Sequence, residues 1–193
     1  MISECAYNFL MKELEGASAY SGGELRTAMG GIVEHLTDLI WGELQKKYPQ
    51  VDAKIVPGPT SPLTITDGCG NHITESVDRH CYIDGQLVLA IECKTYLDKC
   101  FMQRADSDFH LMKTSNSFDA IIVSLENAIA DISYNFFMNQ HNIDQTFFLS
   151  DVKRNSARHI SRYRENIKFS LIEPLINKME SYFINKAGES NII

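Results

Sequence analysis

The chain has 193 residues, of which 44% are apolar and 22% charged, and its formal net charge at pH 7 is −7. This length suits a single domain, or a domain with a small lobe, and the composition is ordinary for a soluble globular protein. No apolar run approaches the roughly 18–20 residues needed to cross a bilayer, so we expect no membrane segment. The amino terminus carries acids early and lacks a basic stretch with a cleavage site, which predicts no signal peptide.

The five cysteines are odd in number and include no Cys-x-x-Cys pair, which argues against a zinc knuckle or a disulfide framework. A reducing cytoplasm is therefore the simplest compartment. The acidic total does not indicate a nucleic-acid binder, but a local basic face can coexist with an acidic remainder. The distribution of charge along the chain matters more than its sum.

The first half of the chain predicts a helix followed by a strand meander. Residues 26–48 are predicted to form an amphipathic helix, because their apolar side chains recur at helical spacing. These side chains are Ile32, Val33, Leu36, Leu39, Ile40 and Leu44. Residues 57–62 form a loop by their Pro and Gly content. Residues 62–96 alternate β-branched residues with Asp-Gly and Gly-Asn turn signals, which is typical of consecutive strands.

The second half alternates helices and strands. We expect helices over residues 96–115 and 128–140, strands over 118–127 and 145–151, and helix from about 151 to 187, bent or restarted near Pro174. Strands that alternate with helices after an antiparallel start predict an α/β fold with a mixed central β-sheet flanked by helices. We expect a single domain over 1–193, with its core at about 24–150 and a basic helical region at about 151–187.

The predicted strand at residues 87–96, LVLAIECKTY, ends in charged residues. Side chains two apart on a strand point the same way, so Glu92 and Lys94 share a face while Cys93 points to the other. A buried ion pair is a weak stabiliser once desolvation is counted. The pair therefore suggests a site, with a structural ion pair on an unrelated meander as the alternative.

Asp78, on the preceding strand, joins this pair only in one hairpin register. A two-residue loop at Asp84-Gly85 pairs Ile83 with Gln86 and sends Asp78 and Glu92 to opposite faces. A three-residue loop with a bulge at Gly85 brings them to one face. A functional site needs the second register, or a bulge elsewhere that restores it.

Two carboxylates and a lysine on one face suit a particular chemistry. The carboxylates can hold a hard cation such as Mg²⁺ and leave positions open for water and phosphate. The lysine can contact a scissile phosphate and orient or activate the attacking water. Attack of water on a phosphodiester is the reaction that such a set serves best.

Asp78, a turn, an apolar strand and then Glu92-Cys93-Lys94 resemble the motif of the PD-(D/E)XK nuclease superfamily, and most closely its type II restriction endonucleases. Val77 stands where the family motif has proline. The resemblance covers roughly residues 30 to 125 by the order of elements. It implies an active site on an antiparallel hairpin, with Asp78, Glu92 and Lys94 catalytic and Mg²⁺ as the cofactor.

The same resemblance suggests further metal ligands. Many members carry an acid on the helix before the sheet, and Glu34 occupies that place, with Gly30 and Gly31 permitting close approach of helix and sheet. Glu34 as a solvated helix residue is the alternative. The backbone carbonyl of Cys93 is another candidate metal ligand. His80 shares a strand face with Asp78, but a structural role suits it better, and Asp84 reads as a turn residue.

A basic stretch follows Asp151 and would contact DNA. On a helix, Arg154, Arg158 and Arg162 form one stripe, whose mutual repulsion a phosphate backbone would relieve. Lys153 belongs to the same stretch, and Asn155 would contact base edges or cap the helix. A basic helix that faces an acidic body or a second subunit is the alternative. Arg104, on the helix after the site, is another candidate contact to double-stranded DNA.

These features predict a Mg²⁺-dependent, sequence-specific DNA endonuclease, cytoplasmic and homodimeric on palindromic DNA. The dimer contact is expected near Phe136-Phe137 or on the C-terminal helix. A repair or recombination nuclease that reads DNA structure remains an alternative, as does a non-catalytic nucleic-acid-binding protein. The chain contains no GxGxxG, GxxxxGK[ST] or GxSxG motif, so we expect no nucleotide cofactor.

Overall fold

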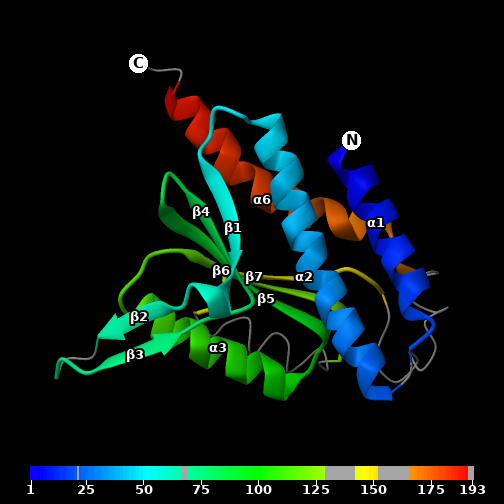
Figure 1. Ribbon diagram of the computed structural model, residues 1–193, viewed down its shortest axis with the longest axis horizontal. Helices are drawn as coiled ribbons and strands as arrows, with labels where there is room; N and C mark the ends of the chain where they lie inside the picture. Colours follow the sequence, from blue (N-terminus) through cyan, green and yellow to red (C-terminus); the bar gives the residue numbers. More distant parts are fainter. Residues whose placement is uncertain (21, 67–68, 129–141, 152–165, 191–193) are drawn as a thin grey trace.

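A five-stranded mixed sheet forms the centre of the computed structural model, which describes residues 1–20, 22–66, 69–128, 142–151 and 166–190 (Figure 1). Strand β4 pairs antiparallel with both β1 and β5, whereas β5, β6 and β7 run parallel to one another. The predicted mixed central sheet is therefore confirmed. In sheet order the strands are β1 (Ala53–Pro57), β4 (Arg79–Ile83), β5 (Gln86–Leu97), β6 (Asp119–Asn127) and β7 (Gln145–Phe148).

Helices cover both faces of this sheet (Figure 1). Helices α1, α2 and α6 pack together on one face and share the larger apolar cluster with it, whereas α3 covers the other face with the smaller cluster. Helix α1 was not predicted, although Ala6, Leu10 and Leu14 recur every four residues and are buried. The bounds are α1 (Ile2–Ala17), α2 (Gly22–Lys47), α3 (Lys99–Lys113) and α6 (Phe169–Ser190).

The predicted meander over residues 62–96 divides into two separate units. Its first part forms a small two-stranded sheet of β2 (Leu63–Thr66) and β3 (His72–Glu75), which contacts α3. Its second part is the hairpin of β4 and β5 in the central sheet. The predicted loop between β1 and β2 contains one short 3-10 turn, η1 (Gly58–Thr60), which lies beside the start of β4.

The helix predicted over residues 151–187 is not continuous, because Ile167 forms a β-bridge and Lys168 is not helical. Ser150 forms an antiparallel bridge with Ile167, and the Asp151 N–H donates to the carbonyl of Asn166 at 3.2 Å. Residues 152–165 lie outside the described part of the chain. Helix α6 begins only at Phe169 and contains Pro174 without ending there.

Two predictions cannot be compared with this fold. The predicted helix at 128–140 lies almost entirely outside the described residues, and so does the pair Phe136-Phe137. Within the ranges that are described, no helix combines the length and apolar character that a membrane span requires.

Candidate active site

The β4–β5 hairpin reaches its register by a two-residue turn and a bulge. Asp84 and Gly85 both have positive φ, 50° and 76°, as a type I′ turn requires, and Ile83 pairs with Gln86. The predicted turn role of Asp84 is thereby confirmed, and of the two possible loops the hairpin has the two-residue one. Between the pairs Tyr82–Leu87 and Cys81–Leu89 the register shifts by one residue.

This shift decides where Asp78 lies. Arg79 pairs with Ile91 beyond the bulge, so Asp78, one residue earlier, lies beside Glu92 on the same face of the hairpin. The bulge thus restores what a two-residue turn alone would prevent. It is one of the two arrangements that the sequence required for a site.

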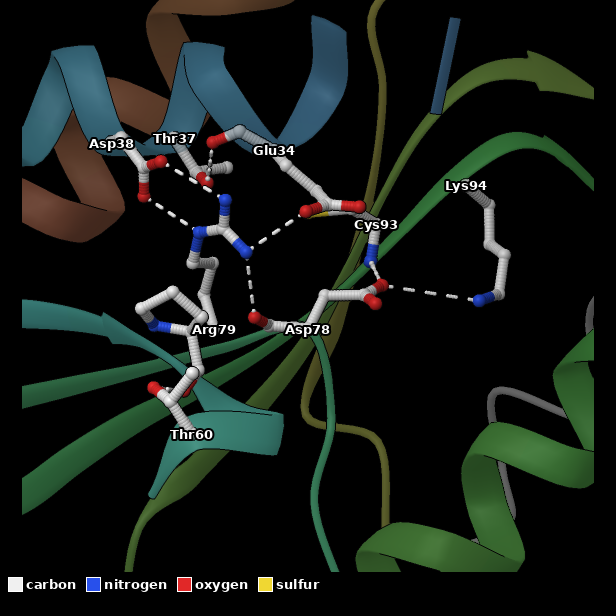
Figure 2. A network of polar contacts seen from close by, with 9 residues as sticks. Glu34, Thr37, Asp38, Thr60, Asp78, Arg79, Cys93 and Lys94 are labelled. Carbon is white, nitrogen blue, oxygen red and sulfur yellow. Dashed lines mark hydrogen bonds and ion pairs between the residues drawn. The ribbon is translucent and has the colours of Figure 1, made fainter. Parts of the chain in front are cut away.

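Asp78, Glu92 and Lys94 come together at this point. The Lys94 ammonium forms an ion pair with Glu92 and lies 3.9 Å from Asp78 Oδ2. The Cys93 N–H donates to Asp78 Oδ2 at 2.7 Å, and Figure 2 shows Asp78 and Lys94 directed toward one another. The three side chains are mostly buried, so water screens their charges only weakly.

Burial dominates the electrostatics of the carboxyl group on β5. It raises the pKa of Glu92 to about 7, against the opposing effect of Lys94, and the negative charges of Asp78 and Asp108 add to the rise. Burial would lower the pKa of Lys94, but Glu92 and Asp78 outweigh it and the pKa of Lys94 is raised. The site therefore holds one stable cation, Lys94, beside the Glu92 carboxyl group, which resists ionising.

Glu34 approaches from the other side of the hairpin, where it pairs with Arg79. Arg79 Nη1 lies 2.9 Å from Glu34 Oε2, and Arg79 Nε lies 2.7 Å from Asp38 Oδ1. Arg79 and Asp38 were not predicted from the sequence. A signal was present, because an arginine at a core-facing strand position requires acidic partners and Glu34 and Asp38 are spaced i, i+4 on a helix.

A close approach of backbone to backbone occurs at Gly58, which was not predicted from the sequence. A Cβ there would lie 1.8 Å from the carbonyl oxygen of Val77, and the Gly58 N–H donates to the carbonyl of Asp78 at 3.1 Å. The close approach expected at Gly30 and Gly31 is wrong. A Cβ on Gly30 would make only an ordinary contact, and one on Gly31 would meet no atom within 4 Å.

His80 is buried beside this loop. Its Nδ1 lies 3.1 Å from the carbonyl of Ser61, its Nε2 has no hydrogen-bond partner among the described residues, and burial lowers its pKa. These contacts favour the structural role over an assisting one.

The expected DNA contacts fall mostly outside the described residues. This holds for Lys153, Arg154, Asn155, Arg158 and Arg162. Arg104 is described, on α3, where it is strongly exposed and lies 3.8 Å from Asp108. Asp108 in turn influences Glu92, so Arg104 lies on the same side of the sheet as the site.

The donor set fits a hard divalent cation. Asp78 and Glu92 offer carboxylate oxygens on one face, and Mg²⁺ is commonly held by one or two carboxylates with water completing its shell. A buried carboxyl group with a raised pKa also gains from a nearby cation. Among the described residues, no group of three His, Cys, Asp or Glu side chains is gathered to hold a metal, and Glu34 is engaged by Arg79.

The chain has similarity to a restriction enzyme in sequence. No family model matches the chain. The chain is 28% identical over 136 residues to the type II restriction enzyme DdeI of Desulfomicrobium norvegicum, and the match covers 56% of this chain and 57% of that enzyme. A solved structure of the native BbvCI A2B2 tetramer aligns with 93% of this chain and 86% of its own, at 15% identity and a TM-score of 0.42. The sequence similarity to a type II restriction enzyme agrees with the resemblance carried by Asp78, Glu92 and Lys94.

Proposed function

We propose that the chain is a Mg²⁺-dependent type II restriction endonuclease, which hydrolyses phosphodiester bonds of double-stranded DNA at a short palindromic site. The observation that carries this proposal is the gathering of Asp78, Glu92 and Lys94 on one face by the β4–β5 bulge. The similarity to the restriction enzyme DdeI, over somewhat more than half of its length, supports it.

Asp78 and Glu92 would hold the cation. A bound Mg²⁺ would supply charge neutralisation at the phosphate and lower the pKa of a bound water. Asp78 is oriented for this task, because the Cys93 N–H fixes one of its oxygens. Glu92 loses its proton near neutral pH, so its carboxylate becomes available at the pH of the cell. Glu34 and the carbonyl of Cys93 remain proposed additional ligands.

Lys94 would act as a hydrogen-bond donor to the substrate. Its raised pKa keeps a proton on Nζ at neutral pH, so it cannot take a proton from the attacking water. It can instead donate to an oxygen of the scissile phosphate and to that water, which fixes their relative position. The positive charge of Lys94 also offsets the charge that develops on the phosphate during attack.

Cleavage of both DNA strands requires two such centres. A two-fold homodimer places one centre on each strand of a palindrome and is the simplest assembly that does so. Residues Lys153 to Arg162 and Arg104 are the proposed contacts to the duplex. Helix α6 exposes Phe169 and Ile184, which makes it a candidate for the dimer contact.

Cleavage assays on purified protein test the function. Plasmid and phage DNA of varied sequence are incubated with and without Mg²⁺, and we expect discrete fragments only with the ion. Lys94→Ala and Glu92→Ala should abolish them. Each of these two residues has a matched control in this chain. The Lys113 side chain is 21% exposed, like that of Lys94, and pairs with Asp144. The Glu180 side chain is 17% exposed, compared with 11% for Glu92.

Lys113→Ala and Glu180→Ala should cleave like the wild type. If no DNA is cut at discrete positions under any divalent cation, or if Lys94→Ala cuts as well as Lys113→Ala, the proposal is wrong.

Sedimentation of the protein with and without a cleaved duplex measures the expected dimer.

A further inference from the structure

Arg79 is a charged residue on the core-facing side of β4. Cys81 and Ile83 follow it on this face as buried apolar side chains, and the Arg79 side chain is 8% exposed. A guanidinium in such a place loses its hydration, and this is costly unless acidic groups and acceptors replace the water. The partners of Arg79 therefore show what the residue does there.

Four hydrogen bonds replace the lost water. Asp38 receives two of them, from Nε at 2.7 Å and from Nη2 at 3.0 Å. Nη1 donates to Glu34 Oε2 and to the carbonyl of Asp78, each at 2.9 Å. Burial alone would lower the pKa of Arg79, but Asp38 and Glu34 raise it, so the guanidinium keeps its charge.

Through these bonds Arg79 connects helix α2 to Asp78, the first of the three proposed catalytic residues. The carbonyl of Asp78 accepts from both Arg79 and the Gly58 N–H, while its carboxylate accepts from Cys93. Asp78 is thus held at its peptide and at its side chain. Figure 2 shows Arg79 between two residues of the helix, Glu34 and Asp38, and Asp78, the residue just before β4.

We propose that Arg79 is a positioning residue, which fixes the peptide of Asp78 and the carboxylate of Glu34 in the orientation that metal binding and hydrolysis require. This inference rests on the proposed function. Arg79 itself lies on the α2 side of the sheet, away from the face that carries Glu92 and Lys94, so it acts through Asp78 and Glu34 and touches no reacting atom.

The fork of the guanidinium is the property that matters. Arginine can hold a carboxylate with two nitrogens and still donate from the third, whereas the compact ammonium of lysine cannot keep this geometry. Arg79→Lys therefore retains the buried charge and removes the orientation. A residue that only balanced charge in the core would tolerate that replacement better than one that positions Asp78.

The test compares Arg79→Lys with wild type in two measurements. Calorimetric titration of Mg²⁺ without DNA should show an affinity lower by about 10–100-fold, and cleavage at saturating Mg²⁺ should fall by a similar factor. Lys178→Ala is the matched control, because Lys178 on α6 forms an equivalent helix-to-strand ion pair with Asp119 at the start of β6. It should change the melting temperature and leave Mg²⁺ affinity unaltered.

Two further variants keep the test decisive. Arg79→Ala should regain part of its cleavage in millimolar guanidinium chloride, and sodium chloride at equal ionic strength should not restore it. Asp38→Asn should lower Mg²⁺ affinity in the same direction as Arg79→Lys, and it decides the matter if the lysine variant fails to fold.

The possible outcomes separate the two proposals. If Arg79→Lys and Asp38→Asn lose thermal stability but keep wild-type Mg²⁺ affinity and cleavage, Arg79 is structural only and the inference is overturned, while the proposed function stands. If the wild type itself neither binds Mg²⁺ nor cleaves DNA, the proposed function fails and this inference fails with it.

Discussion

The carboxylate of Asp78 accepts a hydrogen bond of 2.7 Å from the backbone N–H of Cys93, a residue on the neighbouring strand. This bond fixes the side chain of one proposed metal ligand to the peptide that lies between the other two proposed catalytic residues. It exists because the bulge in β5 brings Asp78 beside Glu92. The relative positions of the three residues therefore depend on backbone geometry as much as on their own ion pairs.

Replacement of Asp78 separates its charge from its hydrogen bond. In Asp78→Asn the amide oxygen can still accept from Cys93, so we expect a stable protein that has lost Mg²⁺ binding and cleavage. Asp78→Ala leaves the Cys93 N–H without its acceptor, which costs about 1–3 kcal/mol if water cannot reach it. Chemical denaturation of both variants measures the difference, and equal stability would show that the bond contributes nothing.

The raised pKa of Glu92 predicts a pH-dependent stability. The carboxyl group has an ordinary pKa of 4.5 in the unfolded chain and about 7 in the folded one, so between these values the folded state binds more protons. Its contribution is fully present below pH 4.5 and is lost as the pH rises through 7. Glu92→Gln removes the titration, so the variant should gain about 2–3 kcal/mol over wild type between pH 5 and pH 8.

Unfolding by urea at the two pH values, without divalent ions, measures this gain. Glu180→Gln is the control, because the pKa of Glu180 is lowered by Lys47 and Tyr48, despite burial, and its titration therefore lies below this window. A Glu92→Gln stability that tracks wild type from pH 5 to pH 8 would contradict the assignment.

Lys94 opposes the effect of burial on Glu92. Its removal in Lys94→Met leaves desolvation, Asp78 and Asp108 acting together, so the pKa of Glu92 should rise above its wild-type value. Carboxyl carbon chemical shifts in the metal-free protein report this pKa directly. Lys113→Met keeps the site intact and should leave the pKa of Glu92 unchanged. A pKa of Glu92 that is the same in Lys94→Met as in wild type would mean that the ion pair is absent in solution.

The alternation along β5 made the proposed catalytic face predictable. Leu89, Ile91 and Cys93 pack toward α2, so the intervening Glu92 and Lys94 had to face the other side. The bulge was not predictable in the same way. Both hairpin registers agreed with the hydrophobic alternation and with a known turn type. The observed bulge goes with the packing of two consecutive residues, Val88 and Leu89, into the cluster beneath α2.

The contacts of Arg79 show a second limit of sequence reasoning. Arg79 and Asp38 are 41 residues apart, and their bond depends on how α2 lies across the sheet. Helical spacing placed Glu34 and Asp38 on one side of α2 but did not say which strand residue would meet them. The packing of α2 on the sheet therefore determined which strand residue meets Glu34 and Asp38, and helical periodicity alone could not predict it.

Replacement by alanine should have opposite effects on stability at Gly58 and at Gly31. A methyl group on Gly58 would lie 1.8 Å from the Val77 carbonyl, so Gly58→Ala must displace the loop that bonds to Asp78, with an expected cost of about 1–3 kcal/mol and a loss of cleavage. Gly31 lies inside α2 with open space around it, so Gly31→Ala should stabilise the protein by about 0.5–1 kcal/mol and leave cleavage unchanged. Melting temperatures and cleavage rates of the two variants, measured side by side, check both signs. A Gly58→Ala protein that melts and cleaves like wild type would mean that the loop does not hold Asp78.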